Sequence, residues 1–422
     1  MKELATEPVP QRGKGTVSMI TKRSALMMRR SFEKQTYRFT QAPPAQFGNS
    51  LGVYLHVPFC YRMCSFCPFY KELFSEELKN RYLTAILKEI DDSGIHGQAK
   101  WVYFGGGTPN TLSVKELAGI VDHLRVKFNI GSLGIELLPS LLTDCYLRDL
   151  RRIGFTKISL GVESFSGEVI GKTGRNLSAC RFIDELVETA ASLGLWVNVD
   201  MMAGLANQSA ESFIDDIRKL TATRPSQITI YPYMVIQGVK DTPSMSDQRQ
   251  FELIEQAAGI LKQAGYARKG VWIFAQGDDV YDSSRDELTQ DYVGFGPSAF
   301  STYGNWKVVN PELGIYLSNL EHNRRLAFVA PKAPAADEWR GFARMIYDLR
   351  TRPDHRFPFY IRVFLLLLKA TGYSRGNKLT PKGLMFAHHV TKSVVESLPF
   401  PIQNPAAVEN YQEYLTCKQK SN

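Results

Sequence analysis

Cysteine is scarce in this chain. Six cysteines occur among 422 residues, and they are too few and too unevenly placed for the disulfide framework of a small secreted protein. Three of the six fall within one short stretch, at Cys60, Cys64 and Cys67. One cluster and three separate cysteines are typical of a protein that stays in a reducing compartment and binds a metal.

Long apolar runs are also missing. The most apolar segment, FYIRVFLLLLKATGY (359–373), contains Arg362 and Lys369, and the six residues between them are far fewer than the ~20 that a membrane-spanning helix needs. The N-terminus has no apolar core followed by a small-residue cleavage site, as a signal peptide would. We therefore predict a cytoplasmic protein in which 359–373 is a buried helix. The alternative is a face for a membrane surface or an apolar substrate.

Acidic residues are few at the N-terminus. Residues 1–50 hold nine basic and three acidic side chains, and so contribute +6 of the net charge of +9. Such an arm can contact anionic lipid, nucleic acid or an acidic partner, or it can be a solvated leader. No nucleic-acid motif accompanies it, so we expect no nucleic-acid partner.

The remaining sequence alternates between strand and helix patterns. About six such units fit between residues 51 and 240, which predicts a parallel sheet with helices outside it. Six units are too few for a closed eight-stranded barrel. We predict an α/β fold, a partial (β/α)6 barrel followed by a small helical or winged-helix domain. The expected division is a basic arm at 1–48, the barrel with its extension at 49–328, a helical accessory domain at 329–400 and a tail at 401–422.

Chemically useful residues follow several of the predicted strands. The cysteines follow 51–57, glycines follow 101–107, and Glu136, Glu163 and Asp200 lie at the ends of further strands. Active groups gather at the C-terminal ends of the strands in such barrels.

The three clustered cysteines predict a metal centre. Cysteine thiolates hold iron–sulfur clusters. A four-iron cubane has four metal corners, so three cysteines leave one iron open. The alternative is a zinc loop, which needs a fourth ligand. The nearby candidate is His56, and it lies within a predicted strand.

The C-x3-C-x2-C spacing with Phe66 before the last cysteine resembles the radical S-adenosylmethionine (SAM) enzymes. The stretch YLHVPFC narrows the resemblance to the group built around oxygen-independent coproporphyrinogen III oxidase. The resemblance covers roughly residues 50–400 and continues in order through further motifs, YFGGGTP (103–109), IELLP (135–139), ISLGVESF (158–165), VDMMAGL (199–205) and VGFGPSAF (293–300).

This resemblance implies a [4Fe-4S] cluster on Cys60, Cys64 and Cys67, whose open iron binds SAM. Reductive cleavage of SAM then gives a 5′-deoxyadenosyl radical, with an electron from a donor such as flavodoxin or ferredoxin. The implied residues around the first SAM are Tyr54, Gly105, Gly106, Gly107, Thr108, Glu136 and Phe300. A second SAM is implied at Phe66, Gly107, Thr108, Glu163, Arg175 and Asp200. We expect Glu163, as a proton acceptor, and the strand-end Tyr233 to be catalytic.

Several positions depart from the porphyrinogen oxidases. Phe69 stands where a further cysteine is usual, and Glu163 stands where a glutamine is usual. Asn176 stands where a histidine or another polar residue is usual, and GLANQ stands where GLPGQ is usual. These departures put oxidative decarboxylation in doubt.

Three interpretations remain open. The preferred one is a class C radical SAM methyltransferase that uses two SAM molecules to methylate an sp2 carbon, at C8 of the naphthoquinone ring of menaquinone. The basic arm and the 359–373 segment would suit such a membrane-lodged quinone, through a peripheral contact with the inner face of the membrane. The first alternative is tetrapyrrole chemistry, either haem degradation to a linear product or coproporphyrinogen III oxidation. The second is a non-enzymatic haem chaperone.

Overall fold

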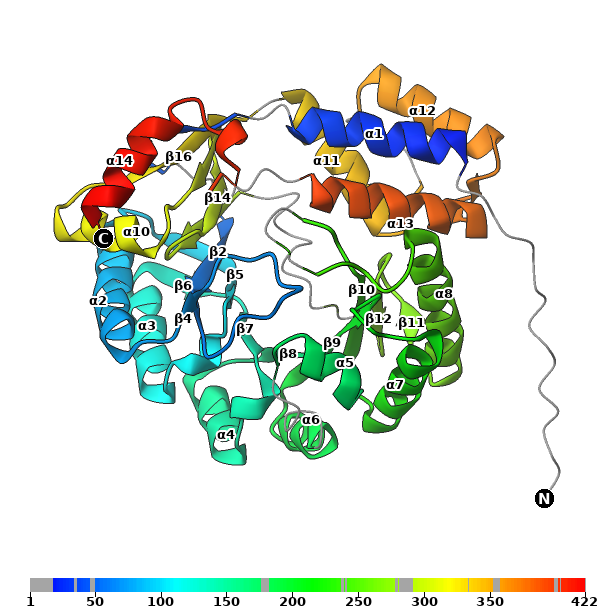
Figure 1. The fold of residues 1–422 in the computed structure, drawn as a ribbon, viewed down its shortest axis with the longest axis horizontal. Helices are drawn as coiled ribbons and strands as arrows, with labels where there is room; N and C mark the ends of the chain where they lie inside the picture. Colours follow the sequence, from blue (N-terminus) through cyan, green and yellow to red (C-terminus); the bar gives the residue numbers. More distant parts are fainter. Residues whose placement is uncertain are drawn as a thin grey trace.

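The computed structural model describes residues 18–33, 36–45, 50–175, 182–236, 239, 241–277, 280, 291–332, 334–351, 357–397, 401–402 and 404–421. Six parallel strands form its centre and lie in the order in which they occur along the chain (Figure 1). They are β2 (Ser50–Val57), β5 (Gly97–Gly106), β7 (Leu133–Leu137), β8 (Lys157–Glu163), β9 (Trp196–Ala203) and β10 (Gln227–Pro232). The predicted partial (β/α)6 barrel is confirmed.

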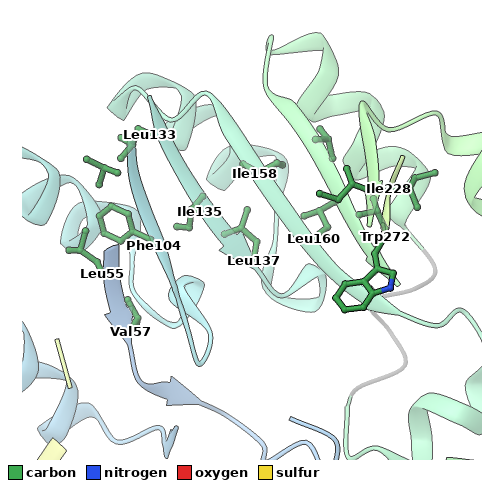
Figure 2. Close-up of a cluster of buried hydrophobic side chains, with 14 of the residues drawn as sticks. Leu55, Val57, Phe104, Leu133, Ile135, Leu137, Ile158, Leu160, Ile228 and Trp272 are labelled. Carbon is green, nitrogen blue, oxygen red and sulfur yellow. The ribbon is translucent and has the colours of Figure 1, made fainter. Parts of the chain in front are cut away.

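Alternation along these strands separates two faces. Every second side chain points outward and joins one large hydrophobic core with the helices (Figure 2). On β5, Val102 and Phe104 belong to that core, whereas Trp101 and Tyr103 lie in a separate aromatic group. Because the two sets alternate, the outward side chains hold the fold and the inward ones line the barrel.

Helices between the strands cover the outside of the sheet (Figure 1). Their starts follow the capping chemistry of the sequence: Ser113 and Glu116 form a capping box on α3, and Thr143 caps α4. Gly154 ends α4 with a φ of 108°, which glycine adopts at little cost. The helices are α2 (Glu76–Asp92), α3 (Val114–Lys127), α4 (Asp144–Ile153), α5 (Gly167–Lys172), α6 (Ile183–Ser192), α7 (Ala210–Thr223) and α8 (Asp247–Gln263).

The sheet continues past both edges of the barrel. Strand β13 (Tyr292–Phe295) pairs in parallel with β2, and β12 (Ile273–Ala275) pairs antiparallel with β10. Beyond β13 the strands are antiparallel, in the order β14 (Phe300–Tyr303), β15 (Trp306–Val309), β16 (Leu326–Pro331) and β1 (Arg38–Gln41).

Shorter elements also occur in the described part of the chain. They are the strands β3 (Phe59–Cys60), β4 (Glu72–Leu73), β6 (Phe128–Ile130), β11 (Ala267–Arg268), β17 (Ser374–Arg375) and β18 (Lys378–Leu379), and the 3-10 helices Pro109–Thr111, Pro139–Leu141 and Pro405–Ala407.

Helices from both ends of the chain lie beside the barrel. They are α1 (Met19–Glu33), α10 (Leu313–Glu321), α11 (Pro334–Tyr347), α12 (Phe359–Ala370), α13 (Pro381–Glu396) and α14 (Tyr411–Ser421). Segments assigned to different expected domains pack against one another. The expected division of the chain into domains stays a prediction. Helix α1 packs on α13, β1 extends the sheet next to β16, and α14 packs against β1 and α10 (Figure 1).

The predicted buried helix at 359–373 forms, but its burial is one-sided. Ile361, Leu365 and Leu368 of α12 are buried, whereas Phe359 and Leu366 are exposed. No helix in the described residues is long and apolar enough to span a membrane.

Candidate functional site

The three clustered cysteines lie in a loop at the C-terminal end of β2. Strands β3 and β4 pair in parallel and close the loop at its base. All three thiols are free; Cys60 is buried, and Cys64 and Cys67 are partly exposed. Burial raises the pKa of Cys60 and Cys67 above that of an ordinary thiol. A bound metal cation would stabilise the thiolate form of these cysteines.

The loop is fixed to its surroundings by polar contacts. Ser65, between two of the cysteines, donates to the carboxylate of Asp241, and the Tyr233 hydroxyl donates to the backbone carbonyl of Asp241 at 3.0 Å. Lys71 donates to the Cys67 carbonyl at 2.8 Å. These contacts tie the cysteine loop to the segment after β10.

His56 is engaged at both ring nitrogens. Nε2 lies 3.0 Å from the Tyr70 carbonyl and so carries the proton, which leaves Nδ1 to accept from the Tyr54 hydroxyl at 3.2 Å. Burial lowers the pKa of His56 to about 4, so the ring is neutral. His56 is therefore not free to serve as the fourth ligand of a zinc loop.

Glycines at the end of β5 leave room beside the cysteine loop. A Cβ on Gly107 would lie 2.7 Å from the Phe59 carbonyl oxygen, and one on Gly106 would lie 2.8 Å from the His56 ring. Gly106 also has a φ of 112°, a conformation that side chains disfavour. Thr108 follows, and its Oγ1 lies 3.3 Å from Cys60 Sγ. The backbone at 106–108 therefore packs directly against the cysteine loop.

Glu136 points into the barrel from β7. The Tyr103 hydroxyl donates to it at 2.6 Å. Burial raises the pKa of Glu136 to about 7, and the neighbouring charges of Asp200 and Glu163 add to the effect. A carboxyl group in this position changes charge near neutral pH.

Glu163 ends β8 and pairs with Arg175. The Arg175 guanidinium lies 3.3 Å from the Glu163 carboxylate, donates to the Gly161 carbonyl at 2.8 Å and stacks over the Phe66 ring at 5.3 Å. Its positive charge also acts on the Cys64 thiol. Burial raises the pKa of Glu163 to about 7 against the opposing effect of Arg175. One guanidinium thus joins the cysteine loop to the carboxylates of the barrel.

Asp200, on β9, is oriented by two donors. Ser159 on β8 donates to one of its oxygens, and Asn198 donates to the other at 2.8 Å. Asn198 accepts in turn from Thr229 at 2.9 Å. This chain of hydrogen bonds fixes the Asp200 carboxylate toward the other two acids.

Phe300 is the last of the residues predicted to lie near SAM. It opens β14 and packs with Tyr54 against the aromatic group of Trp101, Tyr103 and Tyr292. The structure therefore brings the predicted cluster and SAM residues to one end of the barrel. Asn176 and Cys180 lie outside the described residues.

These residues fit the implied cofactors. Three free thiols in one loop suit an iron–sulfur cluster. The glycines form a cradle that a Cβ would fill. Three carboxylates against one guanidinium suit the ammonium and sulfonium charges of SAM. Among the described residues, no three histidine, cysteine or acidic side chains are arranged to hold a single ion.

Tyr233 follows the end of β10 directly. Its side chain is fully buried, packs against Phe66, Val169 and Leu205, and uses its hydroxyl to hold the Asp241 carbonyl. Burial raises its pKa to about 12. Tyr233 therefore packs beside the cysteine loop and supports it through Asp241, and its expected catalytic role stays a prediction.

Sequence reasoning missed several supporting residues. Tyr103, Ser159 and Asn198 hold Glu136 and Asp200, and Asp241 holds the cysteine loop. The sequence does indicate the first three. Each lies two residues from a predicted site residue or inward glycine on its own strand, and residues two apart on a strand point to the same face. Asp241 had no such signal, because its contact joins segments far apart in the chain.

Comparisons with known proteins agree with this geometry. Residues 54–220 match the model of the Radical SAM superfamily. The solved coproporphyrinogen III oxidase of Escherichia coli superposes with a TM-score of 0.69 at 22% identity, covering 87% of this chain and 92% of that one. The fold is therefore a radical SAM fold.

Curated relatives point to one group of proteins. The oxygen-independent coproporphyrinogen III oxidase of Salmonella typhimurium is 28% identical over 300 residues, which are 64% of this chain and 65% of that protein. The heme chaperone HemW of Escherichia coli is 27% identical over 263 residues, 59% of this chain and 69% of that protein. The chain thus spans just under two thirds of the Salmonella relative.

These relatives overturn the preferred interpretation of the sequence. The expected methylation of menaquinone is wrong, since the matched proteins are named for coproporphyrinogen oxidation or as a heme chaperone. They favour the tetrapyrrole alternative. The resemblance to the radical SAM superfamily and to the coproporphyrinogen III oxidase group is supported, whereas a resemblance to menaquinone methyltransferases is not.

Proposed function

We propose that this chain, which matches the Radical SAM superfamily over residues 54–220, is a radical SAM enzyme that acts on a tetrapyrrole. The observation that carries the proposal is the packing of the cysteine loop against the Arg175–Glu163 pair, with the guanidinium stacked on Phe66 of the loop and paired with the carboxylate. The relatives named for coproporphyrinogen III oxidation support the substrate class.

Cys60, Cys64 and Cys67 would hold a [4Fe-4S] cluster. When bound, the cluster and SAM together supply reductive cleavage of SAM to a 5′-deoxyadenosyl radical. The surrounding residues position and shield that chemistry. The burial of Cys60 and the packing of Cys64 and Cys67 against Phe66 and Tyr233 limit the access of water to the thiols.

The barrel residues would bind the cationic groups of SAM. Glu136 is held by Tyr103, and Asp200 by Ser159 and Asn198, so neither carboxylate has to reorganise when a ligand enters. Arg175 is positioned for a ligand carboxylate. A second SAM at Phe66, Glu163, Arg175 and Asp200 is part of this proposal, as is a one-electron donor such as flavodoxin or ferredoxin.

Glu163 would hold or accept a proton. Its pKa of about 7 gives both protonation states near neutral pH, which suits general acid–base work. The carboxylate faces Arg175, so deprotonation leaves a compensated pair rather than an isolated buried charge.

Coproporphyrinogen III oxidation is the first candidate reaction, on the strength of the relatives. Degradation of haem to a linear product is the second. Two departures favour this second candidate: Phe69 stands at the position of a usual cysteine, and Glu163 stands at that of a usual glutamine. Unlike a glutamine, the Glu163 side chain can gain or lose a proton beside Arg175.

The test is an anaerobic assay of the reconstituted protein with reductant and SAM, offered coproporphyrinogen III or haem in separate reactions. Formation of 5′-deoxyadenosine with loss of carbon dioxide from the porphyrinogen supports oxidation. Loss of the haem absorbance with a linear product supports the second candidate. Tight haem binding with neither product would overturn the enzymatic proposal in favour of a haem chaperone.

A further inference from the structure

Helix α12 presents apolar side chains on both its faces. Its inner face packs through Phe364 onto Trp339 and Phe342 of α11 and onto Phe386 of α13. Its outer face exposes five large apolar side chains by 45–74%: Phe359, Tyr360, Val363, Leu366 and Leu367. An outward helix face in water is normally polar, so this exposed stripe requires a partner or a function.

The spacing places the stripe on one side of the helix. Phe359, Val363 and Leu366 follow each other at intervals of four and three residues, so they line up along the axis. Arg362 and Lys369 are exposed and lie seven residues apart along one border of the stripe. The outer face is thus an apolar band with a basic edge.

The surrounding chain is basic as well. Residues 355–395 contain no aspartate or glutamate. Helix α12 contacts the hairpin of β17 and β18, which contributes Arg375 and Lys378, both exposed. One basic residue of this segment, Lys392, is buried and paired with Asp247. The acidic group seen at the stripe is Glu338 of α11, which accepts from the Tyr360 hydroxyl.

We propose that α12 and the adjacent hairpin form a docking surface for an anionic membrane. A helix that lies flat in the lipid interface buries an apolar face and keeps basic side chains at the headgroups, and α12 has this pattern. Its 12 residues extend about 18 Å, which suits lying on a bilayer rather than crossing it.

Charge favours lipid over a second copy of this chain. Two copies joined through α12 would bring Arg362, Lys369 and the basic hairpin residues of both against each other, and like charges at an interface oppose association. An anionic lipid surface attracts the same residues. Helix α12 lies at the outer edge of the molecule, away from α3 and α4 (Figure 1), and the side chains of the stripe are exposed.

The experiment is flotation of the full chain with vesicles of phosphatidylcholine alone and with vesicles that also contain phosphatidylglycerol. We expect binding to the anionic vesicles only. Leu366→Gln should lower partitioning about tenfold or more, from the lost burial of one leucine. Arg362→Gln and Lys369→Gln should each lower it about fivefold, and added salt should do the same.

Matched controls remove similar groups elsewhere. Val126→Gln replaces a side chain that is 83% exposed on α3, and Arg218→Gln removes an exposed charge on α7; neither should change vesicle binding. Circular dichroism confirms that each variant is folded.

Three results would overturn the proposal. The first is equal binding to neutral and anionic vesicles. The second is binding that Leu366→Gln leaves intact, which would assign it to another part of the chain such as the basic N-terminal segment. The third is a dimer by light scattering that Leu366→Gln abolishes, without vesicle binding. The assay needs no cluster and no turnover, so its failure leaves the proposed function untouched.

Discussion

The Arg175 guanidinium lies 3.3 Å from the Glu163 carboxylate, and Glu163 holds this position with a backbone φ of 67°. A non-glycine residue in this region carries a cost of about 1–3 kcal/mol. It coincides with a register shift between β8 and β9 at Gly161 and Glu163. The bulge turns the carboxylate toward Arg175, and strain of this kind concentrates at functional sites.

Binding of SAM should depend on pH through Glu163. The pKa of this residue is raised to about 7, so the carboxylate becomes ionised as the pH rises through 7 and attracts a cationic ligand more strongly. We expect the affinity of the reconstituted protein for SAM, measured by equilibrium dialysis, to rise over this interval. Glu163→Gln should flatten the profile, and Glu136, with a similar pKa, accounts for what remains. An unchanged profile would refute the assignment.

The same shift predicts how the free energy of unfolding varies with pH. Between the ordinary pKa of 4.5 and about 7, the folded chain binds a proton at Glu163 that the unfolded chain does not. The free energy of unfolding should therefore fall as the pH rises through this window. Denaturant unfolding at several pH values should show a shallower fall in Glu163→Gln; an equal fall in both proteins would contradict the prediction.

Each clustered cysteine should be required for the metal centre. Cys60→Ala, Cys64→Ala or Cys67→Ala leaves two thiolates, so reconstituted iron should drop to near background and 5′-deoxyadenosine formation should be lost. Iron analysis and electron paramagnetic resonance measure the first effect. Cys145→Ala, which removes an exposed cysteine on α4, is the matched control and should keep both iron and activity.

Gly107→Ala should disturb the end of β5. The added methyl would lie 2.7 Å from the Phe59 carbonyl oxygen and 2.8 Å from the Pro58 backbone, and neither can move without shifting the cysteine loop. We expect a loss of about 1–3 kcal/mol in stability and weaker SAM binding.

Gly119→Ala provides the control for this change. The position lies within α3, and a Cβ there meets nothing within 4 Å. It should gain up to about 1 kcal/mol from helix propensity. Thermal melting and SAM dialysis distinguish the two variants, and equal behaviour would contradict the predicted clash.

Tyr233→Phe separates support from catalysis. The change removes one hydrogen bond to the Asp241 carbonyl, worth about 0.5–1.5 kcal/mol, and leaves the packing against Phe66 in place. We expect a small loss of stability and slower cluster reconstitution, with near-normal turnover per reconstituted cluster. A collapse of turnover at full iron content would instead support the catalytic role that the sequence predicts.

The sequence by itself determined the fold class. Alternating apolar patterns specify the strands because outward side chains at every second position must reach one core, as Val102 and Phe104 do. The cysteine spacing determined that three thiols share one loop, because residues so close in the chain cannot separate in space; their role as cluster ligands stays a prediction.

Tertiary structure decided the roles of the individual side chains. Tyr233 follows a strand end, as the sequence indicates, but only packing shows that it is buried against Phe66 of the cysteine loop. The apolar 359–373 segment forms a helix, but α11 and α13 cover only one of its faces, and no local pattern records which neighbours a helix will meet. The tie from Ser65 to Asp241 spans the barrel. Such contacts depend on the curvature of the whole sheet, which no short stretch of sequence specifies.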